Sequence, residues 1–140
     1  MYKVIIVDDE SLALEQMVSA VDWELFDFEV YAIFDDSVSA MECLKNEHVD
    51  LVITDIRMPV VTGLDIAQYC YENLPDTLVA FISSYDSFEY ARQAIRYNIL
   101  DYILKPFTYS QLIELLDHAG VMLDNKHSES FASDEEQMQR

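Results

Sequence analysis

The chain has 140 residues, 51% of them hydrophobic, and a formal net charge of −19, which suits one domain around a single core. Its 8 Lys and Arg residues are too few and too scattered for nucleic-acid binding, which draws its affinity from basic side chains that neutralise phosphates. No apolar stretch reaches the roughly 18 residues of a membrane span and no signal-peptide pattern is present, so we expect no membrane contact and a cytoplasmic location.

Strand and helix signals alternate from the first residues onward. The apolar run 4–7 is predicted to be a buried parallel strand. Ser11 is then predicted to cap a helix whose apolar residues follow helical spacing. Trp23 closes the turn before a second strand at 29–34, and Ser37 opens a helix that runs to about residue 47.

The middle of the chain repeats this alternation. Residues 50–54 are predicted to form the central strand, followed by a loop that ends at Gly63 and by a helix that stops at Pro75. Residues 77–82 form the next strand, and Asp86 is expected to open the helix after it. Three apolar residues of that helix are expected to face the core: Phe88, Ala91 and Ile95.

The last elements are a short strand at 100–104 and a helix that begins with a capping box of Thr108 and Gln111. Residues 124–140 are polar and are predicted to be a linker or tail beyond a domain at 1–123. Five strands alternating with five helices indicate an α/β fold. We expect a flavodoxin-like, doubly wound parallel sheet in the order 2-1-3-4-5.

Charged side chains follow three of the predicted strands directly. Asp8 and Asp9 follow the first strand, Asp55 the third and Lys105 the fifth. Because functional groups gather at the carboxyl ends of parallel strands, these four should meet at one edge of the sheet. The carboxylates outnumber the single ammonium, so they should repel one another unless a cation balances them. Oxygen-only ligands favour a hard divalent ion, and Mg²⁺ is expected.

Four motifs resemble the receiver domain of bacterial two-component response regulators, over roughly residues 2–123. They are Val7-Asp8-Asp9-Glu10, Asp55-Ile56-Arg57-Met58-Pro59 with Gly63-Leu64, Ser83, and Tyr102-Ile103-Leu104-Lys105-Pro106-Phe107. The segments Asp22-Trp23-Glu24-Leu25-Phe26 and Ser84-Tyr85-Asp86-Ser87-Phe88-Glu89-Tyr90-Ala91 further resemble regulators that carry a helix-turn-helix output module of the arabinose-regulator class.

The resemblance assigns roles in metal and phosphoryl binding. It implies that Asp55 is the phosphoacceptor, that Asp9 binds Mg²⁺ directly and that Asp8 binds it mainly through water. The backbone carbonyl of Arg57 would be a further metal ligand, and Lys105 would pair with the phosphoryl group.

It also implies a switch. The Ser83 hydroxyl would bond a phosphoryl oxygen, and Tyr102 would be the aromatic residue that rotates toward the core. A simpler interpretation keeps Tyr102 as an amphipathic strand residue with its hydroxyl in water. The peptide bond before Pro106 is usually cis in this family, and X–Pro bonds tolerate that isomer.

The expected function is signalling. A sensor histidine kinase would phosphorylate Asp55, the phosphoryl group would be lost by slow autodephosphorylation, and the chain would not act as an enzyme on other substrates. The output would be a phosphorylation-dependent homodimer that controls transcription, with this chain either an excised domain or a stand-alone receiver. A degenerate receiver that acts only by protein binding is the main alternative.

Two other functions fit the fold less well. Flavodoxin-type cofactor binding needs a phosphate-cradling first loop, and Asp8-Asp9-Glu10 would repel a phosphate. Phosphotransferases with an aspartyl intermediate place a second Asp two residues after the nucleophile, where this chain has Arg57.

Overall fold

The computed structural model describes residues 1–84 and 88–138, and their side chains except at 88 and 129–138. Within these ranges, five strands alternate with five α-helices and one 3-10 turn, as the sequence predicted. The strands are β1 (Tyr2–Val7), β2 (Phe28–Phe34), β3 (Leu51–Thr54), β4 (Leu78–Ser83) and β5 (Asp101–Leu104). The helices are α1 (Ser11–Ala20), η1 (Trp23–Phe26), α2 (Ser37–Asn46), α3 (Gly63–Asn73), α4 (Phe88–Arg96) and α5 (Tyr109–Met138).

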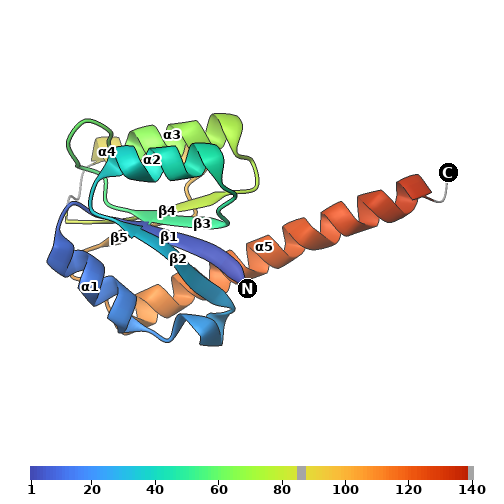
Figure 1. Ribbon diagram of the computed structural model, residues 1–140, viewed down its shortest axis with the longest axis horizontal. Coiled ribbons are helices and arrows are strands. Elements are labelled where there is room, and N and C mark those ends of the chain that lie inside the picture. Colours follow the sequence, from blue (N-terminus) through green and yellow to red (C-terminus); the bar gives the residue numbers. More distant parts are fainter. Residues whose placement is uncertain (85–87, 139–140) are drawn as a thin grey trace.

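All strand pairs are parallel and the sheet order is β2-β1-β3-β4-β5, which confirms the predicted flavodoxin-like topology. Helices α2, α3 and α4 cover one face of the sheet, and α1 and α5 cover the other (Figure 1). Since β1 and β3 are neighbours at the centre, the loops that follow them open on the same edge. This is the switch point at which ligands bind in open α/β sheets.

The core consists of two layers because successive strand residues point to opposite faces of the sheet. In β1, Val4 and Ile6 pack toward α1 and α5, whereas Ile5 and Val7 pack toward α2 and α3. Strands β1, β3 and β4 are therefore buried on both faces over most of their length and have continuous apolar runs, whereas burial alternates along the edge strand β2. That continuity is what made the strands recognisable in the sequence.

Helix starts are only partly as predicted. The capping box of Thr108 and Gln111 is confirmed, since each residue's side chain bonds the backbone N–H of the other, at 2.8 and 3.1 Å. The prediction that Ser11 caps α1 is wrong: the N-cap is Glu10, which makes no side-chain cap, and Ser11 is already the first helical residue. The Asp8 side chain accepts the Glu10 N–H at 3.0 Å, so Asp8 and not Ser11 bonds the backbone at the start of α1.

The predicted core face of α4 is also wrong. Ile95 is 82% exposed and Ala91 is exposed, while Ala94 is buried at 5%. Tyr90 and Tyr97 pack beside Ala94 against the core cluster of α2 and α3. Residues 88–97 carry two apolar stripes at helical spacing, one position apart, and the stripe of Tyr90, Ala94 and Tyr97 is the one that packs against the core. Asp86 and the side chain of Phe88 lie outside the described residues.

Helix α5 does not end at the predicted domain boundary after residue 123. It continues to Met138 and extends well beyond the sheet (Figure 1). Contacts with the domain extend past the boundary as well, because Tyr2 donates a hydrogen bond to Asp124 and the Lys126 ammonium bonds the Pro75 carbonyl at 2.8 Å. The division into a domain and a polar tail remains a prediction, with its boundary inside a continuous helix.

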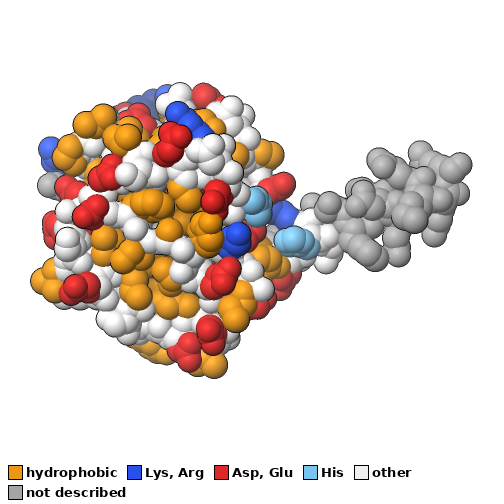
Figure 2. All heavy atoms as spheres, in the orientation of Figure 1, with side chains coloured by type: hydrophobic (Ala, Val, Ile, Leu, Met, Phe, Trp, Pro, Cys, Tyr) orange, Lys and Arg blue, Asp and Glu red, His pale blue; other side chains and the backbone are white. Residues whose placement is uncertain are grey.

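On the face over β2, acidic side chains lie singly around hydrophobic ones between α1 and α2 (Figure 2). In the part of the chain that the structure describes, no helix combines the length and the apolar character needed to cross a bilayer.

Candidate functional site

Three carboxylates converge at the carboxyl edge of the sheet. Asp8 follows β1 and Asp55 follows β3, and each is only 6% exposed, whereas Asp9 is exposed. Asp8, Asp9 and Asp55 each present one oxygen such that all three lie within 4.8 Å of one another. The carboxylates meet because β1 and β3 are parallel neighbours whose carboxyl ends lie side by side. The pairing continues one residue past β3, where the Asp55 N–H donates to the Val7 carbonyl at 3.0 Å.

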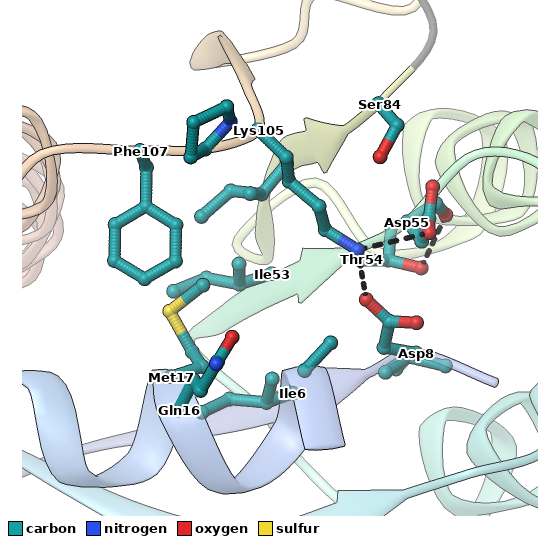
Figure 3. Close-up of a pocket in the computed structure, with 14 residues that line it drawn as sticks. Ile6, Asp8, Gln16, Met17, Ile53, Thr54, Asp55, Ser84, Lys105 and Phe107 are labelled. Atoms are coloured by element: carbon teal, nitrogen blue, oxygen red, sulfur yellow. Dashed lines mark hydrogen bonds and ion pairs between the residues drawn. The ribbon is translucent and has the colours of Figure 1, made fainter. Parts of the chain in front are cut away.

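Lys105 completes the cluster from the end of β5. Its ammonium lies 2.5 Å from Asp8 Oδ2 and 3.3 Å from Asp55 Oδ2 (Figure 3). Burial by itself would lower the pKa of Lys105, but the hydrogen bond to Asp8 and the charges of both carboxylates outweigh it and raise that pKa above its ordinary value of 10.5. Lys105 is therefore charged at neutral pH. The peptide bond between Lys105 and Pro106 is cis, as expected.

The backbone around Asp55 is tightly held. Asp55 Oδ1 accepts the Ile56 N–H at 2.7 Å, and the Gly63 N–H bonds the Ile56 carbonyl at 2.7 Å. A Cβ on Gly63 would lie 2.2 Å from the Asp55 carbonyl oxygen, a distance that no side chain tolerates. Gly63 is thus required where α3 begins, because the helix terminus approaches the backbone of Asp55 directly.

The donor set fits a hard divalent cation. The three carboxylates and one ammonium sum to a charge of −2, and the ligand atoms are all oxygens. Oxygen ligands from carboxylates, with room for water and a phosphate oxygen, suit Mg²⁺. Lys105 bonds one oxygen of Asp8 and one of Asp55, and the second oxygen of each accepts a backbone N–H, from Glu10 and Ile56 respectively. The remaining lone pairs of these oxygens and the exposed Asp9 carboxylate can still bind a metal.

The remaining predicted residues surround this cluster. Ser83 ends β4 fully buried, and its carbonyl accepts the Lys105 N–H at 2.9 Å. Arg57, two residues after Asp55, has an exposed side chain. Tyr102 is half-buried, with its ring edge-on to Phe81 at 6.0 Å. Their roles in metal binding and switching remain predictions.

A cavity of about 450 Å³ beside Lys105 was not foreseen. It lies between α1 and the loop after β5, with Gln16, Met17 and Phe107 on the side of Lys105 away from Asp55 (Figure 3). Ser84 lines it near the carboxylates, whereas the predicted Ser83 does not. The sequence held no signal for Gln16 or Met17, because the spacing of α1 indicates core packing alone.

The loop after β3 also holds unforeseen backbone strain. Val60 is 87% exposed and has φ 68°, in the left-handed region that a β-branched residue rarely adopts. The Val61 N–H bonds the Pro59 carbonyl at 2.8 Å across it. Strained residues cluster at functional sites, and this one lies five residues after Asp55.

Comparison with protein families gives a match over residues 4–117 to the family described as the response regulator receiver domain. An uncharacterized response regulatory protein of Staphylococcus epidermidis is 39% identical over 117 residues, which cover 84% of this chain and 46% of that protein. The transcriptional regulatory protein HptR of Staphylococcus aureus is 38% identical over 116 residues, which cover 83% of this chain and 45% of HptR. The chain therefore spans less than half the length of these curated relatives.

Solved structures give the same result. The REC domain of AraT, a response regulator from Geobacillus stearothermophilus, superposes with a TM-score of 0.83 at 35% identity, covering 90% of this chain and 98% of that one. A two component transcriptional regulator AraC from Clostridium phytofermentans superposes with a TM-score of 0.77 at 25% identity, covering 92% and 99%. With the matched segment spanning the acidic cluster and Lys105, this chain belongs to the response regulator receiver domain family.

Proposed function

We propose that this receiver domain is a phosphorylation-dependent switch that accepts one phosphoryl group on Asp55 from a sensor histidine kinase. The observation that supports it is the placement of Asp55, which lies beside Asp8, Asp9 and the Lys105 ammonium at the rim of an open cavity. The test is the intact mass of the protein after incubation with acetyl phosphate and Mg²⁺. A mass that stays unchanged under conditions that label other receivers contradicts the proposal.

The residues present suit in-line transfer. The nucleophile is the Asp55 carboxylate, whose bond to phosphorus forms as the bond from phosphorus to the kinase histidine nitrogen breaks. Bound Mg²⁺ would supply charge compensation at the phosphoryl oxygens, held by Asp9 and Asp55 directly, Asp8 through water and the carbonyl of Arg57. Lys105 is already charged and within 3.3 Å of Asp55, so it stabilises the negative charge that arrives. Slow hydrolysis of the acyl phosphate then resets the switch, and the reaction remains stoichiometric.

Phosphorylation changes the neighbourhood of Ser83 and Tyr102. It adds roughly two negative charges and three acceptor oxygens at Asp55. We propose that the Ser83 hydroxyl turns to bond one of these oxygens and that Tyr102, which packs edge-on to Phe81, moves further toward the core. The backbone bond between Lys105 and Ser83 links both changes to the ends of β4 and β5.

The surface that would respond is formed by α4, β5 and α5. It exposes apolar side chains that the core does not use: Ile95 at 82%, Leu104 at 40% and Tyr109 at 56%. Arg92 and Arg96 are exposed on the same helix as Ile95. Apolar residues framed by charge are typical of protein interaction sites, and the proposed partner is a second copy of the domain.

Beryllofluoride, a phosphate mimic, is expected to shift the protein from monomer to dimer through this surface in sedimentation velocity. Ile95→Lys should prevent the shift, because it places a charge in the contact, whereas Leu25→Lys should not, since Leu25 is 77% exposed on η1. Ser83→Ala should weaken the shift while Mg²⁺ binding persists. Coupling is reciprocal, so the dimer must also bind the mimic more tightly than the monomer does.

Equal masses with and without beryllofluoride, at concentrations well above micromolar, would remove self-association as the output. A heterologous protein partner would then be the better hypothesis, and the phosphorylation proposal would be unaffected.

Mg²⁺ is expected to raise the melting temperature of the wild-type protein, as a ligand that binds only the folded state does. Asp9→Ala should abolish this rise. The same substitution should raise the melting temperature of the metal-free protein, because one of three mutually repelling carboxylates is lost and the exposed Asp9 gives up little packing. Asp117→Ala, an exposed acidic residue on α5, is the control for net charge. If Mg²⁺ still protects Asp9→Ala, the ligand assignment is wrong.

We further propose that the output is transcriptional and that the protein acts in the cytoplasm. The relatives are about twice as long as the matched segment, and one is a transcriptional regulatory protein. One structural neighbour is a two component transcriptional regulator named AraC, which supports a transcriptional output, and the motifs at 22–26 and 84–91 are the basis for proposing a helix-turn-helix module of the arabinose-regulator class. Assay of a reporter promoter with the full-length protein and its Asp55→Asn variant would test this.

The alternative is a stand-alone or degenerate receiver that acts by protein binding alone. The structure offers little support for degeneracy, since Asp8, Asp9, Asp55, Ser83 and Lys105 are all present and four of them converge. A stand-alone receiver differs only in lacking an output domain, and its phosphorylation chemistry would be the same.

A further inference from the structure

A second cavity lies at the opposite edge of the sheet from Asp55, and its volume of about 480 Å³ is within the range of small-molecule sites. It opens beside Leu78 and Val79, the first residues of β4, which pair with β3 on one side but have no β5 residue opposite them on the other, since pairing with β5 begins only at Ala80 and Asp101. Apolar and aromatic side chains from α3, β4, the loop before β5 and α5 form most of its wall: Cys70, Tyr71, Leu74, Leu78, Tyr97 and Ile99.

The fourth wall is a stripe of α5. His118, Met122 and Lys126 recur every fourth residue, so they lie on one face of the helix and line the cavity together. Two of the three carry or can carry positive charge. In a chain with 27 acidic and 8 basic residues, two such side chains on the wall of one cavity are unexpected.

Lys126 is bonded to a neutral partner. Its ammonium donates to the Pro75 carbonyl at 2.8 Å, and among the residues whose side chains are described no carboxylate lies within ion-pair distance of it. Asp50 and Asp76 line a smaller cavity of about 130 Å³ that Lys126 also borders. An ammonium has three donors, and among the described residues only the Pro75 carbonyl accepts from it, at one of the three.

We infer that the 480 Å³ cavity binds a small organic acid, with its apolar body against β4 and α3 and its carboxylate on Lys126. The apolar part of the wall would bury the body of such a ligand, and the Lys126 ammonium would pair with its negative charge. Asp50 and Asp76 would repel the carboxylate from the smaller cavity, which directs the acid into the larger one. This site is independent of phosphorylation at Asp55.

Because the cavity lies where α5 extends beyond the sheet, a bound acid should hold this helix more firmly to the domain. The helix leaves the domain here, held by the hydrogen bond from Tyr2 to Asp124 and by that from Lys126 to Pro75. A carboxylate on Lys126 adds to these contacts and connects α5 to α3 and β4. Binding should therefore slow hydrogen exchange of the α5 backbone around residues 120–126.

The test uses octanoate, measured by calorimetry and by amide chemical shifts. We expect saturable binding with one octanoate per chain and shifts confined to the cavity wall. Octanol, which has the same apolar body without the charge, should bind at least tenfold more weakly. Lys126→Gln should weaken octanoate binding by a similar factor, and Met122→Trp, which fills the cavity, should abolish it.

Lys45→Gln is the matched control, because Lys45 is exposed on α2 and lies over the Tyr69 ring instead of over a cavity. It should bind octanoate as the wild type does, and so should Asp55→Asn. Equal affinities for octanoate and octanol, an unaltered affinity in Lys126→Gln, or no binding at millimolar octanoate would each overturn the inference.

Discussion

Asp55→Asn is expected to abolish phosphorylation completely, whereas the wild-type protein gains one phosphoryl group from acetyl phosphate and Mg²⁺. The carboxamide has nearly the shape of the carboxylate, and its oxygen can still accept the Ile56 N–H that Asp55 Oδ1 accepts at 2.7 Å. It is not a nucleophile toward phosphorus, however, and it carries no charge for Mg²⁺ or Lys105. Intact mass spectrometry of both proteins under the same conditions measures the difference.

Asp50→Asn provides the matched control. Asp50 precedes β3 and is buried at 7%, where it accepts the Lys3 N–H and pairs with His48 at the edge of the sheet away from the site. That variant should be phosphorylated like the wild type. If Asp55→Asn were labelled, the phosphoacceptor would be another residue. If the wild type were never labelled, the degenerate receiver would replace the proposed function.

Gly63→Ala is expected to destabilise the fold strongly and to prevent phosphorylation. The added methyl group would lie 2.2 Å from the Asp55 carbonyl oxygen and 2.9 Å from the Ile56 Cα, and both contacts are backbone atoms that cannot rotate away. Overpacking usually costs about 1–3 kcal/mol, and a clash with backbone falls at the upper end of that range. The free energy of unfolding in urea measures this loss, and the intact-mass assay measures the effect on Asp55.

Gly120→Ala separates this clash from the general effect of replacing glycine. Gly120 lies within α5, and apart from its chain neighbours and the nearby backbone of that helix, a Cβ added to it would have no heavy atom within 4 Å. The change should therefore stabilise the protein by about 0.5–1 kcal/mol through helix propensity. Opposite signs for the two substitutions are expected. If both changed the free energy of unfolding alike, the approach of Gly63 to Asp55 would not constrain the site.

The strands, their order and the main residues of the acidic cluster could all be predicted from the sequence alone. Strands β1, β3 and β4 are apolar over most of their length, because a parallel sheet covered on both faces admits few polar side chains, here Thr54 and Ser83 at the strand ends. Asp8, Asp55 and Lys105 each follow such a run directly, and parallel strands bring their carboxyl ends to one edge. Local patterns thus sufficed to predict that these residues meet.

Packing between distant parts of the chain determined the features for which local patterns allow more than one outcome. Helix α4 has two apolar stripes, and only contact with the sheet placed Ala94 inside and Ile95 in solvent. Helix α5 continues past residue 123 although its later residues are polar, and Tyr2 and Lys126 attach it to distant parts of the chain. The cavities of about 450 and 480 Å³ arise where elements far apart in sequence leave space between them, so no spacing along the chain encodes them.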